Sequence, residues 1–162
     1  MYERAIVEWF KKNKRDLPWR KTDAWGVLVS EIMLQQTQVS TVTERYQLFL
    51  KRFPTLKSLA MAPIDDVMAL WSGLGYYSRA RNLHRCAQII MVEHGGDFPQ
   101  TREALESLPG IGRSTAGAIA AFAYKERSPI LDANVKRVLS RFYGIEGDLQ
   151  DQKTIKELWL KA

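Results

Sequence analysis

Apolar residues recur at helical spacing along most of the chain, and no run shows the apolar–polar alternation of a half-exposed strand. Val42, Tyr46, Phe49, Leu50 and Phe53, for example, fall on one stripe of a helix, which the following proline ends. The same reasoning predicts helices over the first dozen residues and near 27–36, 56–60, 65–70, 78–94, 103–107, 114–124, 134–143 and 153–160, with an irregular connection over 15–26. The pattern predicts an all-α protein with about nine or ten helices and short connections.

Composition narrows the class of protein. The chain has 162 residues, of which 46% are hydrophobic and 26% charged, as is typical of a globular domain. No segment approaches the roughly 18–20 apolar residues of a membrane span, and acids interrupt the apolar N-terminus, so we expect neither a membrane protein nor a signal peptide. Cys86 is the only cysteine, which excludes an internal disulfide and argues against a cysteine-bound metal. We therefore expect a cytoplasmic protein.

The distribution of charge indicates a polyanionic partner. The net charge is +6 with a pI of about 9.5, and two windows, 67–92 and 107–125, contain no acidic residue. Arg79, Arg81 and Arg85 lie in the first window, and Arg113 lies in the second. We interpret these windows as phosphate-facing surfaces, although a solvated basic face would produce the same pattern.

A glycine turn between two predicted helices is the first chemical motif. In Leu108-Pro-Gly-Ile-Gly, Gly110 and Gly112 allow a tight hairpin and a close approach of the backbone to a ligand. The helix that follows directs its free N–H groups and its positive dipole end to the same point, and Arg113 adds charge. This predicts a phosphate site that is indifferent to base sequence. The alternative is an ordinary helical hairpin with a glycine turn.

Two carboxylates form the second motif. Glu31 lies in an otherwise apolar helix, where burial would raise its pKa toward the range of a general acid; alternatively, a buried partner binds it structurally. Asp132 lies just before a helix after the apolar stretch 129–131. It is either a simple N-cap or a carboxylate presented to a site opposite the hairpin. Gln36 and Thr37 end the Glu31 helix with groups that suit base edges, or as a C-terminal cap.

Several ordered segments, 17–20, 30–37, 73–84, 108–117 and 130–141, together resemble the helix-hairpin-helix DNA glycosylase superfamily, and specifically its MutY-type adenine DNA glycosylases. The resemblance covers the chain from about residue 4 to its end. It implies a base-flipping hydrolase that removes adenine mispaired with 8-oxoguanine or guanine in double-stranded DNA, in base excision repair. We expect it to act as a monomer.

The resemblance also implies residue roles. Glu31 would protonate adenine at N7, and Asp132 would stabilise the oxocarbenium-like sugar, directly or through a covalent intermediate. The expected adenine pocket comprises Trp19, Arg20, Leu34 and Val39. The expected DNA contacts are Gln36, Thr37, the Leu74 backbone, Tyr76, Arg79, Arg81, Gly110, Gly112, Arg113, Ser114 and Asn134, with Tyr76 wedging into the base stack unless it is a core aromatic. Relatives that also cut the strand carry a lysine at the place of Ser114, so no lyase activity is expected.

The family usually continues with four cysteines that hold a [4Fe–4S] cluster, and this chain lacks those ligands, so we expect no cofactor and no metal site here. The expected division is 1–15, a first helix that belongs to a truncated second module; 16–128, the catalytic core with the hairpin near 103–124; and 129–162, a return segment that carries Asp132 and the start of that module. The alternative function is a catalytically impaired DNA-binding fragment. Retention of both carboxylates favours the enzyme, because binding alone needs neither.

Overall fold

The computed structural model describes residues 2–162, with side chains from residue 3 onward, and within this range all regular secondary structure is helical. The elements are α1 (Tyr2–Asn13), the short 3₁₀ helix η1 (Pro18–Arg20), α2 (Ala24–Leu34), α3 (Val39–Arg52), α4 (Leu56–Ala60), α5 (Ile64–Trp71), α6 (Ser78–Glu93), α7 (Arg102–Glu106), α8 (Arg113–Ala123), α9 (Ala133–Tyr143) and α10 (Gln152–Lys161). The predicted all-α class and helix number are confirmed. The sequence pattern missed η1, where Pro18 starts a single turn inside the predicted irregular connection.

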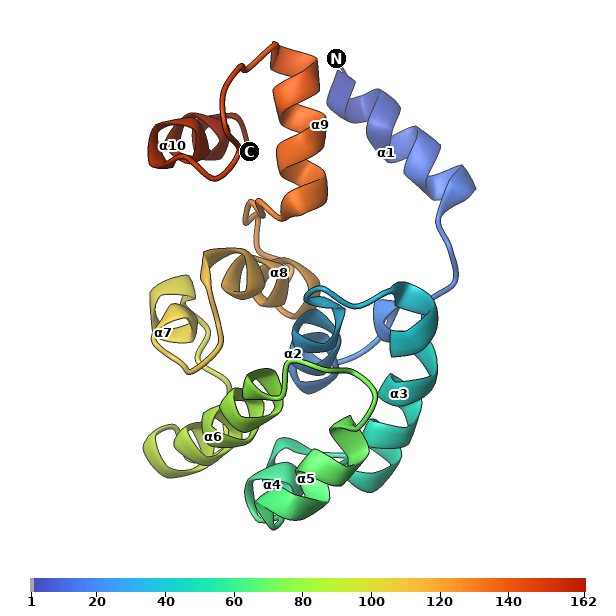
Figure 1. Cartoon of the computed structure of the whole chain (residues 1–162), viewed down its shortest axis with the longest axis vertical. Coiled ribbons are helices and arrows are strands. Elements are labelled where there is room, and N and C mark those ends of the chain that lie inside the picture. Colours follow the sequence, from blue (N-terminus) through green and yellow to red (C-terminus); the bar gives the residue numbers. More distant parts are fainter. Residues whose placement is uncertain (1) are drawn as a thin grey trace.

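Helix α2 is the centre of the fold, and it packs against α3, α6 and α8 (Figure 1). Its start is earlier than the apolar pattern predicted, because the side chain of Asp23 caps it by accepting a hydrogen bond from the Gly26 N–H at 2.9 Å. Only glycine fits at position 26, since a Cβ there would lie 2.0 Å from Thr22 Oγ1. Most α2 side chains are buried, which explains the nearly continuous apolar run.

An aromatic cluster closes the core between α3 and α5. The ring of Phe49 packs edge-on against Phe53 and Trp71, at centroid distances of 5.1 and 5.9 Å. These three side chains are fully buried. Edge-to-face pairs of this kind each contribute about 0.5–1.5 kcal/mol beyond burial. The core between α3 and α5 is therefore closely packed.

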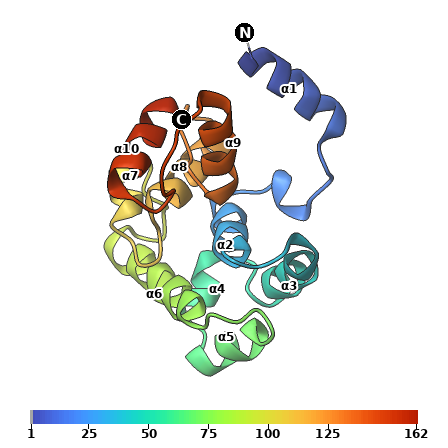
Figure 2. The same cartoon turned by 45° about the horizontal axis from the view of Figure 1, so that its top comes forward.

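The chain enters the core from α1 and leaves it through α9. Figure 1 places α1, α9 and α10 together at one end, with both termini, and the turned view of Figure 2 agrees. Helix α9 has no buried residue, and Ile6 and Trp9 on α1 are 55% and 64% exposed. These three helices contribute little to the core that holds the site.

Candidate active site and DNA-facing surface

A small cavity of about 160 Å³ lies where η1, α2 and α8 meet. Its lining consists of Trp19, Arg20, Val27, Ser30, Glu31 and Phe122. The indole of Trp19 is held by an edge-on contact with the Tyr46 ring at 5.4 Å, and the Arg20 guanidinium lies 4.8 Å from the Phe10 ring centroid. Aromatic and aliphatic walls with a few polar groups are typical of a pocket for a flat heterocycle.

Glu31 is the acidic group of this cavity, and its pKa is raised from 4.5 to about 7. Burial is the larger cause, because it disfavours the charged carboxylate, and the negative charge of Asp132 is the second. Within residues 2–162 the Glu31 side chain has no hydrogen-bonding or ion-pair partner. This removes the alternative of a glutamate bound structurally to a buried partner. A carboxyl group that is half-protonated near neutral pH suits a general acid.

Asp132 is both the N-cap of α9 and a charge that acts on Glu31. Its Oδ1 accepts a hydrogen bond from the Val135 N–H at 2.7 Å. The preceding residue is fixed to the hairpin helix, since the Leu131 N–H donates to Ser114 Oγ at 3.0 Å. Gly117 lets the return segment lie against α8, because a Cβ there would be 2.5 Å from the Pro129 carbonyl oxygen. Asp132 can therefore be the N-cap of α9 and a carboxylate presented to the site at the same time.

The cavity includes part of the predicted adenine pocket. Trp19 and Arg20 line it, whereas Leu34 and Val39 lie outside its lining, so a contact of these two residues with adenine stays a prediction. Leu34 lies at the last residue of α2 and packs against the core, and Val39 starts α3 beyond the Gln35–Gln38 turn. Val27, Ser30 and Phe122 were missed as lining residues. Val27 could have been found as the residue four before Glu31 on the same helix, whereas nothing in the sequence signals Phe122.

Two turns, one after α2 and one before α6, each hold a non-glycine residue in a left-handed backbone conformation. Gln36 has φ 56° and Tyr76 has φ 46°, and the Tyr76 side chain is 62% exposed. Left-handed non-glycine residues cost about 1–3 kcal/mol each and concentrate at functional sites. Tyr76 is thus no core aromatic. Leu74 is buried, its N–H donates to the Trp71 carbonyl, and its own carbonyl accepts from Arg79.

The prediction that Arg79 binds phosphate is wrong. Its side chain is buried, 8% exposed, and its guanidinium donates to protein acceptors from α2 and from both turns. These acceptors are the carbonyls of Ile32, Met33, Gln35, Leu74 and Gly75 and the Thr37 hydroxyl. The physical reason is that the last carbonyls of a helix lack internal partners, and a guanidinium satisfies several at once.

The hairpin has the geometry that its sequence predicted. Gly110 has φ +78°, and a Cβ there would lie 3.0 Å from Asn82 Cβ, so glycine is required. Gly112 is the N-cap of α8, and both Gly112 and Arg113 are exposed. The Arg113 guanidinium stacks on the Trp159 ring at 3.8 Å from the centroid. Arg81 and Asn134 are also exposed, so their DNA contacts stay predictions.

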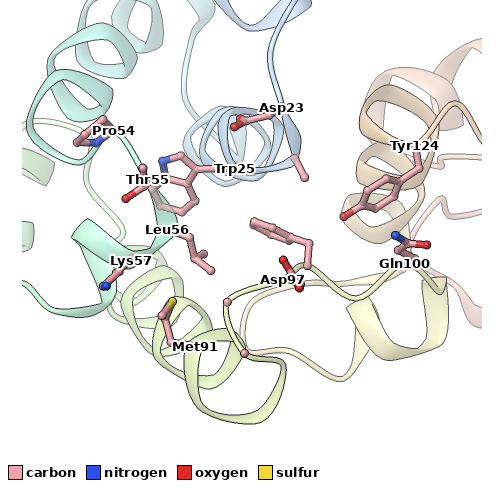
Figure 3. A pocket seen from close by; sticks show the side chains of 14 residues that line it. Asp23, Trp25, Pro54, Thr55, Leu56, Lys57, Met91, Asp97, Gln100 and Tyr124 are labelled. Atoms are coloured by element: carbon pink, nitrogen blue, oxygen red, sulfur yellow. The ribbon is translucent and has the colours of Figure 1, made fainter.

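A larger open groove of about 860 Å³ lies elsewhere, between the start of α2, the start of α4 and the end of α6 (Figure 3). Trp25, Leu56, Met91 and Tyr124 line it together with Asp97. Neither Glu31 nor Asp132 belongs to it. Size alone therefore does not identify the reactive site.

The chain does not fit an iron–sulfur cluster. Cys86 is its only cysteine, and burial raises the pKa of that thiol to about 12, away from the thiolate that a metal requires. No group of three or more His, Cys, Asp or Glu side chains suited to a metal occurs among the described residues. Among residues 2–162, no helix has the length and apolar character to cross a membrane.

Comparisons with known proteins agree with the fold. Residues 29–162 match the family described as "HhH-GPD superfamily base excision DNA repair protein", and the chain belongs to this superfamily. It is 47% identical over 161 residues to the adenine DNA glycosylase of Buchnera aphidicola subsp. Acyrthosiphon pisum, covering 98% of this chain and 46% of that protein. It is 44% identical over 165 residues to the adenine DNA glycosylase of Homo sapiens, covering 96% of this chain and 30% of that protein. The chain thus spans less than half the length of these relatives.

Solved structures show the same architecture. A thermostable thymine-DNA glycosylase superposes with a TM-score of 0.83 at 28% identity, over 93% of this chain and 69% of that one. A non-covalent endonuclease III–DNA complex superposes with a TM-score of 0.77 at 20% identity, over 97% and 76% of the two chains. At the latter identity the likeness establishes the fold alone.

Proposed function

We propose that this chain carries the catalytic core of a monofunctional adenine DNA glycosylase, which hydrolyses the N-glycosidic bond of adenine opposite 8-oxoguanine or guanine. The observation that carries the proposal is Glu31, a carboxyl whose pKa burial and Asp132 raise to about 7, in a small cavity with walls from Trp19, Val27 and Phe122. The name adenine DNA glycosylase, shared by the bacterial and mammalian relatives, supports adenine as the base.

In the proposed reaction the C1′–N9 bond of a flipped-out adenosine breaks, and its electron pair stays on the base. Glu31 donates its proton to adenine N7, which makes the base a better leaving group, and such acid catalysis contributes about 10²–10⁴-fold. Asp132 offers a negative charge to the developing sugar cation. Water then adds its oxygen to C1′ and releases a proton, so that the products are free adenine and an abasic strand. Ser114 carries no amine and cannot form a Schiff base with that sugar.

We infer that the partner is double-stranded DNA with an adenine mispair, bound by a monomer in the bacterial cytosol or nucleoid. The exposed hairpin turn and the exposed Arg81 and Arg113 support a DNA partner, since backbone N–H groups at a helix start and arginines are common phosphate contacts. A single, buried, unpaired cysteine is in keeping with a reducing compartment.

A single-turnover assay on duplexes with adenine opposite 8-oxoguanine tests the proposal. The parental chain should release adenine, and Glu31→Gln should reduce the rate at least about a hundredfold while duplex affinity stays the same. Duplexes with thymine or cytosine at the target position serve as substrate controls. Tight binding by the parental chain without release would support the impaired DNA-binding fragment instead, and equal rates for parent and variant would reject Glu31 as the acid.

A further inference from the structure

Arg79 is the only described side chain that joins the end of the Glu31 helix to both strained turns. One terminal nitrogen, Nη1, donates to the carbonyls of Ile32 and Met33 at 2.9 Å each, and to the Gln35 carbonyl. The other, Nη2, donates to Thr37 Oγ1 at 3.0 Å and to the carbonyls of Leu74 and Gly75 at 3.0 and 3.2 Å. The planar fork therefore connects residues 32–37 with residues 74–75.

The charge of this guanidinium is balanced by dipoles and rings. Among the described residues no carboxylate pairs with it. The C-terminal carbonyls of α2 carry the negative end of the helix dipole, which a cation stabilises. The rings of Trp71 and Tyr76 lie 5.5 and 5.6 Å from the Arg79 carbon Cζ, within cation–π range. Trp71 also fixes the second turn directly, because its Nε1–H donates to the Gly75 carbonyl at 3.2 Å.

Each of the two turns that Arg79 connects holds one strained residue. Gly73 and Gly75 in the second turn adopt φ +87° and +68° without strain, because glycine has no Cβ, but Gln36 and Tyr76 are left-handed residues that carry a side chain. Such conformations persist only where surrounding contacts over-determine them. Without the guanidinium, each turn would relax independently toward ordinary φ values. Arg79 is thus the shared support that keeps Gln36 and Tyr76 at a fixed separation.

We propose that Arg79 is a positioning residue that sets the spacing between the Gln36–Thr37 turn and the Tyr76 turn, and thereby the preference for the base opposite adenine. This rests on the proposed function, because it assumes that the first turn meets the opposite base and that Tyr76 enters the stack. Arg79 does not touch DNA in this scheme. Lysine cannot replace all of these contacts, since one ammonium has three donors, whereas the two terminal guanidinium nitrogens reach six acceptors.

Amide hydrogen exchange of Arg79→Lys, with Arg52→Lys as the matched control, tests whether Arg79 couples the two turns. Both changes keep the net charge, and Arg52 is an exposed residue at the end of α3 that has no place in the proposed site. We expect exchange in Arg79→Lys to be at least about tenfold faster in both 35–37 and 73–77, and unchanged in Arg52→Lys. Acceleration in only one turn, or in neither, would overturn the proposal. If Arg79→Lys does not fold, Thr37→Val can be used instead, because it removes only one acceptor of Arg79. We then expect faster exchange in residues 73–77. Unchanged exchange there would contradict a coupling of the two turns through Arg79.

The effect of Arg79 on the preference for the opposite base is measured as the ratio of two single-turnover rates, for adenine opposite 8-oxoguanine and for adenine opposite guanine. This ratio of rates does not depend on the fraction of the protein that is active, so a loss of folded protein alone would leave it unchanged. We expect Arg79→Lys to lower the ratio several-fold with the salt slope of duplex binding unchanged, whereas loss of a phosphate contact would lower the slope by about one. A ratio equal to that of Arg52→Lys rejects the proposal. If the parental chain releases no adenine, the proposed function fails, and the exchange experiment still decides the role of Arg79.

Discussion

Burial and, second to it, the charge of Asp132 raise the pKa of Glu31, although helices α3 to α8 separate the two residues in the sequence. Glu31 lies on the last turns of α2, and Asp132 caps α9 after a segment that α8 holds in place through Ser114. A buried carboxyl whose pKa is raised beside a second carboxyl suits the role of the acid, and the second suits that of the anion.

The rate of adenine release should fall as pH rises through about 7. The protonated form of Glu31 is the active acid, and above its pKa of about 7 the proton is lost. Single-turnover rates between pH 5.5 and 9, measured with enzyme in excess, show this decrease directly. The residual rate of Glu31→Gln should not decrease in this way, and a parental rate that is constant up to pH 9 would contradict Glu31 as the general acid.

Glu31→Gln should make the protein more stable at pH 8 and leave it almost unchanged at pH 4. The folded state binds the Glu31 proton more tightly than the unfolded state does. The stability that this proton contributes is therefore fully present below about pH 4.5 and is lost as pH rises through about 7. At about 1.4 kcal/mol for each pKa unit, the gain at pH 8 reaches at most about 3.5 kcal/mol for a shift from 4.5 to about 7. Urea unfolding at both pH values measures it. Glu44→Gln, on the exposed side of α3, is the control that should show no such difference.

Asp132→Asn should separate catalysis from capping. Asparagine caps a helix as well as aspartate does, so the free energy of unfolding should change by less than about 0.5 kcal/mol. The rate of base release should still fall at least tenfold, because the charge facing the sugar is gone, about 1.4 kcal/mol or more of transition-state stabilisation. Asp132→Ala, which loses cap and charge together, should in addition lose about 1 kcal/mol of stability. An Asp132→Asn variant with parental turnover would leave Asp132 as a cap alone.

Duplex affinity should decrease steeply with salt, with a log–log slope of several units, since each neutralised phosphate contributes about −0.9. Arg81→Gln should make the slope shallower by about one. Lys57→Gln is the control, because Lys57 lines the groove of Figure 3, away from the hairpin and the Glu31 cavity. Fluorescence anisotropy with an unmodified duplex between 50 and 300 mM salt gives both slopes. An affinity that does not depend on salt would remove the electrostatic argument.

Ser114 should decide the type of product. The parental chain should leave an intact strand with an abasic site, cut only by alkali or heat. Ser114→Lys places an amine at the start of α8, where the helix dipole lowers its pKa and favours the nucleophilic form, so borohydride should trap a protein–DNA adduct. Ser114→Ala is the matched control, because it also loses the acceptor for the Leu131 N–H, at about 1 kcal/mol, without gaining an amine. Strand cleavage by the parent, or a lysine variant that releases adenine and never traps, would count against this.

The sequence by itself determined the elements and the chemistry that depends on local order. Helical spacing in α3, the glycines that allow the 108–112 hairpin, and an acid inside the apolar run of α2 are properties of neighbouring residues, so they could be recognised without a fold. Trp19 and Arg20 were found because the ordered motifs resemble a known family. Helix starts were less certain, since a single cap such as Asp23 can extend a helix by a turn.

Only the tertiary structure decided which side chains meet. Arg79 belongs to a basic, acid-free window that indicates a phosphate surface, yet its guanidinium is buried against the carbonyl end of α2. Phe122 lines the cavity although it is distant from every other lining residue in the sequence, whereas Leu34 and Val39 lie outside its lining. The raised pKa of Glu31 depends on burial and on Asp132. Burial and long-range charge depend on how helices pack, and helix packing is a property that no local pattern of residues encodes.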